Sequence, residues 1–395
     1  MARLIFLCVL VFVGCTSQAV SQSPFFAAAP TSPLTVGSGP TRVLLADLNG
    51  DGHLDLVTSH FRSQQVVVQL GDGTSAFETA PESPVLPGYS PGDIGLGDVN
   101  GDRILDLAIT RSDRDAVDLF LGDGTGAFRL KDGSPLALSE SSEFFTRILH
   151  LVDINEDGNL DIVTATDGRN GTPLPGVLLG DGRGGFSAGP SINLDPGGGL
   201  YSFGFGDLDV DGHLDVVTVS RAPGTGLGPG RIAMQRGDGT GTFQGGSSSS
   251  VSVPPGPRFG VLADVNGDRR LDIVLSHGGS SSLSVVLNSG DASFAPAPGS
   301  PFQLETPAFG VLVADVNRDA MPDLLAATVQ NQRPPYESAL TVLLGTGAGF
   351  VAAGPPIPTG PGSYRLTLGD INSDGKLDVV VPSGAGDSLT LLLGR

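Results

Sequence analysis

The chain has 395 residues and a formal net charge of −20, from 42 acidic and 22 basic side chains. This acidic balance argues against nucleic acid as a partner. The 59 glycines and 30 prolines are too frequent for long helices and exclude a mainly helical fold. Length alone would allow two or three domains.

The first element is an apolar segment, residues 4–13, that follows Arg3. It is too short to span a membrane and has the form of a secretory signal. We predict a signal peptide over residues 1–19, cleaved after Ala19. The alternative is a lipoprotein signal that ends at residue 14, with Cys15 lipidated as the anchor. Either segment predicts an exported protein that is secreted, periplasmic or lipid-anchored at the cell surface, with no transmembrane span in the mature chain.

Both cysteines of the chain, Cys8 and Cys15, fall within this targeting segment. The folded body, residues 20–395, is therefore expected to contain no disulfide and no cysteine-based metal site.

The next element is a strand over residues 25–35. Its sequence FAAAPTSPL, residues 26–34, matches FETAPESPV at 77–85 and FAPAPGSPF at 294–302. The chain ends at Arg395 just before another copy of this piece would be due. We therefore predict that the N-terminal strand completes the last repeat and closes a ring, which removes two exposed sheet edges.

The loop DLNGDGHLD follows, at residues 47–55. Its side-chain oxygens recur at positions 1, 3, 5 and 9, and glycine at position 6 permits a bend with positive φ. Calcium takes six to eight oxygen ligands, so such a loop, with the backbone carbonyl of position 7, could enclose one ion. A solvated Asx-rich turn is the alternative for a single copy.

Six more copies follow, at residues 98–106, 153–161, 207–215, 264–272, 315–323 and 370–378, spaced 51 to 57 residues apart. A period of this size indicates a repeat architecture. Each loop lies between two short Val- and Leu-rich segments, and a third apolar segment, a GDG turn and a Pro-rich stretch follow. Four antiparallel strands in each of seven repeats predict an all-β, seven-bladed β-propeller over residues 20–395.

The seven loops, together with the Phe-Gly pairs at 203–204, 259–260 and 309–310, resemble the FG-GAP/VCBS repeat family, which includes the propellers of integrin α-subunits. The resemblance covers nearly all of the chain from about Phe26. It implies a propeller whose innermost strand comes first in each blade, with calcium bound between strands 1 and 2. It implies no single function, because members include adhesion modules, lectins and accessory domains of enzymes.

We predict up to seven Ca²⁺ ions that neutralise clusters of like charge and stabilise the ring. Non-glycine residues at position 6, Arg103, Arg269 and Ala320, would be strained, so the sixth loop should bind most weakly, and the fourth, which has Asp209 at position 3, among the most tightly. The predicted ligands are Asp47, Asn49, Asp51, His53 and Asp55; Asp98, Asn100, Asp102, Ile104 and Asp106; Asp153, Asn155, Asp157, Asn159 and Asp161; Asp207, Asp209, Asp211, His213 and Asp215; Asp264, Asn266, Asp268, Arg270 and Asp272; Asp315, Asn317, Asp319, Met321 and Asp323; and Asp370, Asn372, Asp374, Lys376 and Asp378. At position 7 only the backbone carbonyl is meant.

The calcium loops and the GDG turns should share one face of the ring, and we interpret the GDG aspartates, such as Asp72, as hairpin residues. The opposite face collects arginines and tyrosines. Six residues are predicted to ring the mouth of the central channel and to bind an acidic or carbohydrate ligand: Arg42, Arg147, Tyr201, Arg258, Phe309 and Tyr364. The alternative is that they are ordinary loop residues that balance the acidic face.

No catalytic motif is present, so we predict a binding or adhesion module, or a surface scaffold, for carbohydrate or protein ligands, and not an enzyme. The alternative is a polysaccharide-acting enzyme or enzyme-accessory domain with His60 and His277 near a site at the channel mouth. We expect a monomer.

Overall fold

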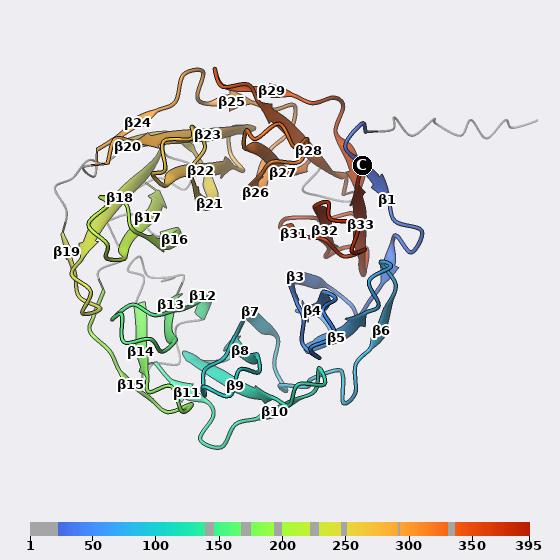
Figure 1. Cartoon of the computed structure of the whole chain (residues 1–395), viewed down its shortest axis with the longest axis vertical. Helices are drawn as coiled ribbons and strands as arrows, with labels where there is room; N and C mark the ends of the chain where they lie inside the picture. The colour runs from blue at the N-terminus through green and yellow to red at the C-terminus, as the bar shows by residue number, and fades with distance from the viewer. Residues whose placement is uncertain are drawn as a thin grey trace, which may run out of the picture.

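The computed structural model describes residues 23–138, 146–166, 175–192, 200–221, 229–245, 251–290, 293–330 and 336–395. These residues form strands and turns without a helix, and the strands make seven antiparallel sheets around a central axis (Figure 1). Accordingly, the described residues contain no helix able to cross a membrane. The predicted targeting segment lies outside the described residues. The predicted all-β, seven-bladed propeller is confirmed.

Each sheet is one blade, and the first strand of each blade lies nearest the axis (Figure 1). The first three blades are β3 (Pro40–Ala46), β4 (Asp55–His60), β5 (Gln65–Gly71) and β6 (Phe77–Thr79); β7 (Pro91–Gly97), β8 (Asp106–Arg111), β9 (Ala116–Gly122), β10 (Phe128–Leu130) and β11 (Leu136–Ala137); and β12 (Thr146–Val152), β13 (Asp161–Thr166), β14 (Pro175–Gly180) and β15 (Phe186–Ala188).

The fourth to sixth blades follow the same order. They are β16 (Leu200–Gly206), β17 (Asp215–Arg221), β18 (Pro229–Gly237), β19 (Phe243–Gly245) and β20 (Val251–Pro255); β21 (Pro257–Ala263), β22 (Asp272–His277), β23 (Ser282–Asn288), β24 (Phe294–Pro296) and β25 (Phe302–Gln303); and β26 (Ala308–Ala314), β27 (Asp323–Val329), β28 (Ser338–Gly345), β29 (Phe350–Ala352) and β30 (Ile357–Thr359).

The seventh blade joins the two ends of the chain. It contains β31 (Thr367–Gly369), β32 (Asp378–Ser383) and β33 (Ser388–Gly394), and its outer strand is supplied by β1 (Phe26–Ala28) and β2 (Leu34–Thr35). Phe26 pairs with Gly394, and Leu34 pairs with Leu389. The predicted closure of the ring by the N-terminal strand is therefore confirmed.

The outer strand is interrupted in most blades, which explains the irregular, Pro-rich stretch in the sequence. In four blades a Ser-Pro pair lies at the break, and its serine hydroxyl accepts the backbone N–H that the interruption would leave without a partner on strand 3. The bonds are Val68 to Ser83, Leu119 to Ser134, Val285 to Ser300 and Leu391 to Ser32, at 2.9–3.1 Å. The serine thus replaces a backbone acceptor where the ladder is broken.

The hydrophobic core lies between blades. Seven clusters of buried side chains occur in the described residues, and each joins one blade to the next. Strand 2 is covered on both sides, so β4, β22, β27 and β32 are buried along their whole length. This is why these strands read as continuous runs of Val, Leu, Ile, Thr and Ser rather than as an alternation of apolar and polar residues.

The two faces of the ring are built as predicted. The GDG turns meet the aspartate loops of the preceding blade, since Ser75 N–H donates to the Ile371 carbonyl and Gly184 N–H to that of Val99. On the other face, the turns after strand 2 meet the linkers before strand 1, as between Phe61 and Gly39. We call these the aspartate face and the arginine face.

The closure of the ring gives the first testable prediction. The side chain of Phe26 is 3% exposed and packs with Val342 and Leu392. Phe26→Ala should lower the free energy of unfolding by about 3 kcal/mol, because it leaves a cavity in the seam that closes the ring. Thermal and urea melts measure this. Phe61→Ala, at a residue that is 51% exposed, is the control and should change stability little; equal losses for both variants would contradict the role of Phe26.

Candidate functional site

The seven aspartate loops join strand 1 to strand 2 and share one hydrogen-bond pattern. The position-1 carboxylate accepts the N–H of position 6 at 2.7–3.1 Å in every loop, as Asp47 accepts from Gly52. The position-5 carboxylate accepts the N–H of position 7 at 2.8–2.9 Å, as Asp51 accepts from His53. Each loop is therefore folded around its own carboxylates, which holds their oxygens close together.

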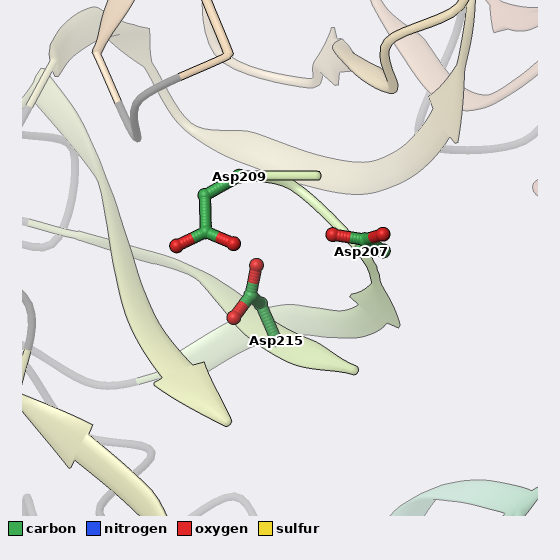
Figure 2. A group of neighbouring side chains, drawn as sticks. All are labelled: Asp207, Asp209 and Asp215. Atoms are coloured by element: carbon green, nitrogen blue, oxygen red, sulfur yellow. The ribbon is translucent and has the colours of Figure 1, made fainter. Parts of the chain in front are cut away.

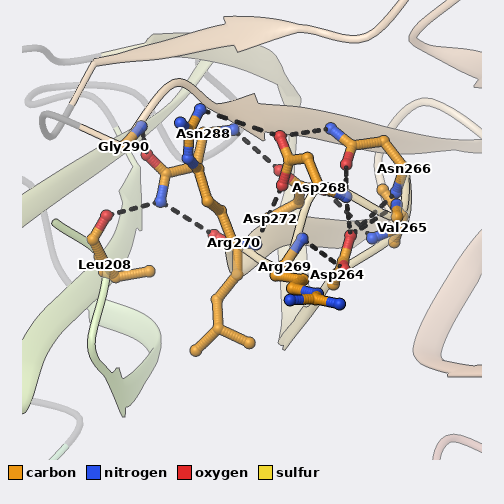
Figure 3. A network of polar contacts seen from close by, with 12 residues as sticks. Leu208, Asp264, Val265, Asn266, Asp268, Arg269, Arg270, Asp272, Asn288 and Gly290 are labelled. Atoms are coloured by element: carbon orange, nitrogen blue, oxygen red, sulfur yellow. Dashed lines mark hydrogen bonds and ion pairs between the residues drawn. The ribbon is translucent and has the colours of Figure 1, made fainter. Parts of the chain in front are cut away.

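The position-9 aspartate has a second role that the sequence did not reveal. One oxygen accepts the N–H of position 2 at 2.8–3.1 Å, and the other accepts the N–H of the last residue of strand 3 at 2.7–3.0 Å. Figure 3 shows this for Asp272, which binds Val265 and Asn288. We call this arrangement the aspartate clasp. It occurs in all seven blades, at Asp55, Asp106, Asp161, Asp215, Asp272, Asp323 and Asp378.

The clasp carboxylates are buried. Burial raises the pKa of all seven carboxyls above the ordinary value, and that of Asp272 to about 6, although the two N–H donors act in the opposite direction. Each clasp therefore places a buried carboxyl group beside the loop oxygens.

The clasp explains the first glycine of the GDG motif. A Cβ at Gly71 would lie 2.3 Å from the Leu54 carbonyl oxygen, so a side chain cannot be added without moving the backbone. The fifth blade has Asn288 at this position. Its amide donates to the Leu208 and Leu271 carbonyls, at 2.7 and 3.2 Å, and so links the blade to its neighbour (Figure 3).

The GDG aspartates act as hairpin residues, as predicted. Asp72 accepts the N–H and the hydroxyl of Thr74, and Asp123 and Asp238 do the same with Thr125 and Thr240. Their carboxylates serve their own turns.

Backbone strain differs between the loops. Arg103, Arg269 and Ala320 at position 6 have φ of 65–69°, so the predicted positive φ is confirmed. Position 4 also has positive φ in all seven loops. Three loops have glycine there, at Gly50, Gly101 and Gly267, and this pattern could have predicted it. The sixth loop alone has no glycine at either position, because Arg318 and Ala320 occupy them. It is the most strained of the seven.

The fourth loop brings its carboxylates closest together. One oxygen each of Asp207, Asp209 and Asp215 lies within 4.8 Å of the others, and Figure 2 shows Asp209 and Asp215 pointing toward one another. Arg236 holds Asp209 Oδ2 at 3.1 Å, while Asp209 Oδ1 is buried and accepts no hydrogen bond. In five other loops position 3 is an asparagine whose amide donates to the position-5 carboxylate instead.

Neighbouring loops touch one another on the aspartate face. The His53 imidazole lies 3.1 Å from the Ser373 hydroxyl, and that of His213 lies 3.0 Å from Glu156. Arg318 donates to the Gly375 carbonyl. Glu156, Ser373 and Arg318 are all position-4 residues, so the exposed corner of one loop meets the loop of the next blade.

A cavity of about 830 Å³ lies within the ring of inner strands. Of the six predicted mouth residues, Arg42, Tyr201, Arg258, Phe309 and Tyr364 line it. The side chain of Arg147 lies outside the described part of the structure. The guanidinium of Arg258 lies 5.8 Å from the ring of Tyr201 and 5.4 Å from that of Phe309, and Phe309 meets Tyr364 edge to face at 5.2 Å.

The cavity wall also contains groups that were not predicted, namely Asp93, Arg365 and His150. Asp93 Oδ1 lies 3.2 Å from Arg42 Nε and 3.6 Å from Arg365 Nη1, so one carboxylate from β7 pairs with arginines of the first and seventh blades. Its other oxygen accepts the N–H of Leu149 in the third blade. Burial lowers the pKa of His150, which packs against Phe203 and Phe205. No pattern in the sequence around Asp93 marked it.

Other residues of the arginine face are engaged in local structure. Arg111 binds Asp113 and Asp118 at 2.8 Å and stacks on Tyr89, whose hydroxyl also donates to Asp118. Arg114 lies near Asp113 as well. The guanidinium groups of Arg111 and Arg114 therefore form ion pairs within their own turn.

A family model described as an FG-GAP-like repeat matches residues 47–109, 98–164, 153–218 and 264–326. Together these segments cover more than half of the chain. The protein belongs to the FG-GAP-like repeat family. Each matched segment begins at the first aspartate of a loop and ends within strand 2 of the next blade, so the family repeat spans the contact between two blades.

Solved structures with the same shape are distant in sequence. A BBS1 N-terminal domain in complex with ARL6 has 14% identity over 94% of this chain and 97% of its own, with a TM-score of 0.61. A lectin of Agrocybe aegerita that recognises non-reducing terminal N-acetylglucosamine has 18% identity over 90% and 94%, with a TM-score of 0.50. The Dos1 propeller has 11% identity over 86% and 75%, with a TM-score of 0.53. No curated protein sequence matches the chain. At these identities the structures establish the fold of this FG-GAP-like protein alone.

One predicted location is wrong. The enzyme alternative placed His60 and His277 near the channel mouth, as loop residues after strand 2, but each is the last residue of strand 2 and is fully buried. Neither is among the described residues that line the cavity. Burial lowers the pKa of both imidazoles to about 4. They are neutral core groups. The prediction was wrong because polar residues at the end of a buried strand resemble those of a loop.

Loop strain gives the second prediction. Ala320→Gly should raise the free energy of unfolding by about 1 kcal/mol, because glycine adopts positive φ without a steric penalty. Urea denaturation of the two proteins measures the difference. The control is Ala295→Gly, in an exposed strand, which should lower stability by a similar amount. A loss of stability in both variants would contradict the assignment of strain to the sixth loop.

Proposed function

We propose that this FG-GAP-like propeller is an exported, calcium-binding module that holds a carbohydrate or protein ligand at the mouth of its central cavity and catalyses no reaction. The observation that carries the proposal is the cavity lined by Arg42, Tyr201, Arg258, Phe309 and Tyr364. Aromatic rings and guanidinium groups around one concave site are suited to recognition of polar ligands. The proposal that the protein is exported depends on the sequence of the N-terminal segment. We also propose that the protein is a monomer.

Calcium is proposed on the chemistry of the aspartate loops. The fourth loop fits a cation best, because three carboxylates converge there and Asp209 Oδ1 is buried without a donor. A hard divalent cation would supply the missing positive charge, with Asp207, Asp209, Asp211 and Asp215 and the His213 carbonyl as ligands. The other six loops have aspartates at positions 1, 5 and 9 as well, and each has asparagine at position 3.

The known ligands of similar propellers support both ligand classes. One such propeller binds the protein ARL6, and another recognises N-acetylglucosamine. The enzyme alternative gains no support from His60 and His277, which are buried away from the cavity.

Calcium gives the third prediction. Extracellular-type sites with dissociation constants of about 10⁻⁴–10⁻³ M would each contribute about 0.4–1.4 kcal/mol at 1 mM calcium. The melting temperature in 1 mM CaCl₂ should therefore exceed that in EDTA. Asp209→Asn should reduce the difference, whereas Asp72→Asn, in a GDG turn, should leave it unchanged. Superimposable melts of the wild type in CaCl₂ and EDTA would refute the calcium proposal.

The cavity gives the fourth prediction. A glycan array and a pull-down in calcium, each with an EDTA control, should identify a ligand whose binding falls at least tenfold in Arg258→Ala. Arg114→Ala, on the same face but engaged with Asp113, is the matched control and should bind normally. A ligand that both variants bind like the wild type would place the site elsewhere.

A further inference from the structure

The described lining of the central cavity is positively charged, whereas the protein as a whole is negatively charged. The described lining contains three guanidinium groups, those of Arg42, Arg258 and Arg365, and one carboxylate, that of Asp93. The chain as a whole carries a net charge of −20. A positive cavity in an acidic protein selects and attracts an anion, because low-dielectric walls concentrate the field of the lining charges.

Two of the arginines lie beside the same carboxylate. Asp93 pairs with Arg42 at 3.2 Å and Arg365 at 3.6 Å, and its second oxygen is held by the N–H of Leu149. Among the described lining residues, this one carboxylate stands beside two guanidinium groups, so the described lining has more cationic than anionic groups. An anion bound beside them would reduce the repulsion between the two cations.

Arg258 is placed differently. Its guanidinium lies between the rings of Tyr201 and Phe309, and no carboxylate of the described residues lies within ion-pair distance of it. A planar guanidinium fixed by aromatic rings presents a ready bidentate donor for a carboxylate. The adjacent rings offer apolar faces on which the C–H face of a sugar can stack.

A groove lies beside the cavity. This second hollow has a volume of about 360 Å³ and is lined by Phe61, Arg62, Tyr336, Tyr364 and Arg365. Tyr364 and Arg365 line both hollows, so the two lie next to each other. Phe61 is 51% exposed and Tyr364 is 42% exposed, although both are large aromatic side chains. Exposed aromatic groups of this kind mark interaction surfaces.

We propose that the ligand is an acidic oligosaccharide, an inference that rests on the proposed function. One uronate unit of this ligand enters the central cavity. The rest of the ligand extends along the groove, over the seam between the seventh and first blades. The linings of the two hollows combine aromatic rings with guanidinium groups, and Arg62 lies 3.9 Å from Asp387. A chain in which every unit carries both a sugar ring and a carboxylate matches that combination. A peptide held by strand addition would instead need a free sheet edge.

The experiment is calorimetric titration of the full chain in calcium with dimers and hexamers from three series: galacturonate, alginate and hyaluronan. At least one hexamer should bind about tenfold or more tightly than its dimer. Arg258→Gln should weaken both the dimer and the hexamer about tenfold. Phe61→Ala with Tyr336→Ala should weaken the hexamer about tenfold and leave the dimer unchanged. Leu130→Ala, a 55% exposed residue of an outer strand, is the control and should change neither.

The outcomes separate this inference from the proposed function. Equal affinity for the dimer and the hexamer would overturn the proposed binding along the groove. Equal affinity for a hexamer and its carboxyl-reduced form would overturn the requirement for carboxylate groups. Binding of hexaglutamate in preference to every oligosaccharide would overturn the sugar class while leaving a ligand site in the cavity. If no acidic oligosaccharide binds, the inference fails, whereas the cavity proposal fails only if no ligand at all responds to Arg258→Gln. Thermal melts establish that each variant is folded.

Discussion

The fold of this propeller depends on a buried carboxylate that joins three parts of each blade. The clasp aspartate begins strand 2, and its two oxygens accept one N–H from the loop before it and one from the end of strand 3. A single side chain thus fixes the bend after strand 1 and the register of strand 3. Because an unpartnered buried N–H costs about 1–3 kcal/mol, sevenfold repetition of this bond pair constrains the whole ring.

The clasp is also confined to one face of the ring. It requires aspartates and tight turns on the aspartate face, where side chains form hydrogen bonds with the backbone and with one another. The arginine face has no such constraint, and its connections vary in length and composition between blades. Arg258, Tyr201 and Phe309 come from three neighbouring inner strands, so the rigid ring determines their positions while the sequence of each blade determines the chemistry. In the proposed function, fold and recognition are divided between opposite ends of the same strands.

Features that repeat along the chain could be predicted, because seven copies of one pattern average out local ambiguity. The strands, the closure by Phe26 and its neighbours, and the positive φ at Ala320 were all evident from the period. Features that occur once were not. Asp93 lies in one inner strand and acquires its partners only when the first, second and seventh blades meet. The clasp was missed for another reason: Asp55 and the Gly71 N–H are 16 residues apart, so no local pattern connects them. His60 and His277 were misplaced because polar residues at a strand end resemble a loop.

The central claim is best tested by the free energy of unfolding of Asp55→Asn and Asp51→Asn, measured by urea denaturation in calcium-free buffer. Asparagine at position 55 keeps one acceptor and turns an N–H group toward a backbone donor, whereas asparagine at position 51 can still accept from His53. The account predicts that Asp55→Asn loses about 1–3 kcal/mol more than Asp51→Asn. Equal losses for the two variants would contradict it.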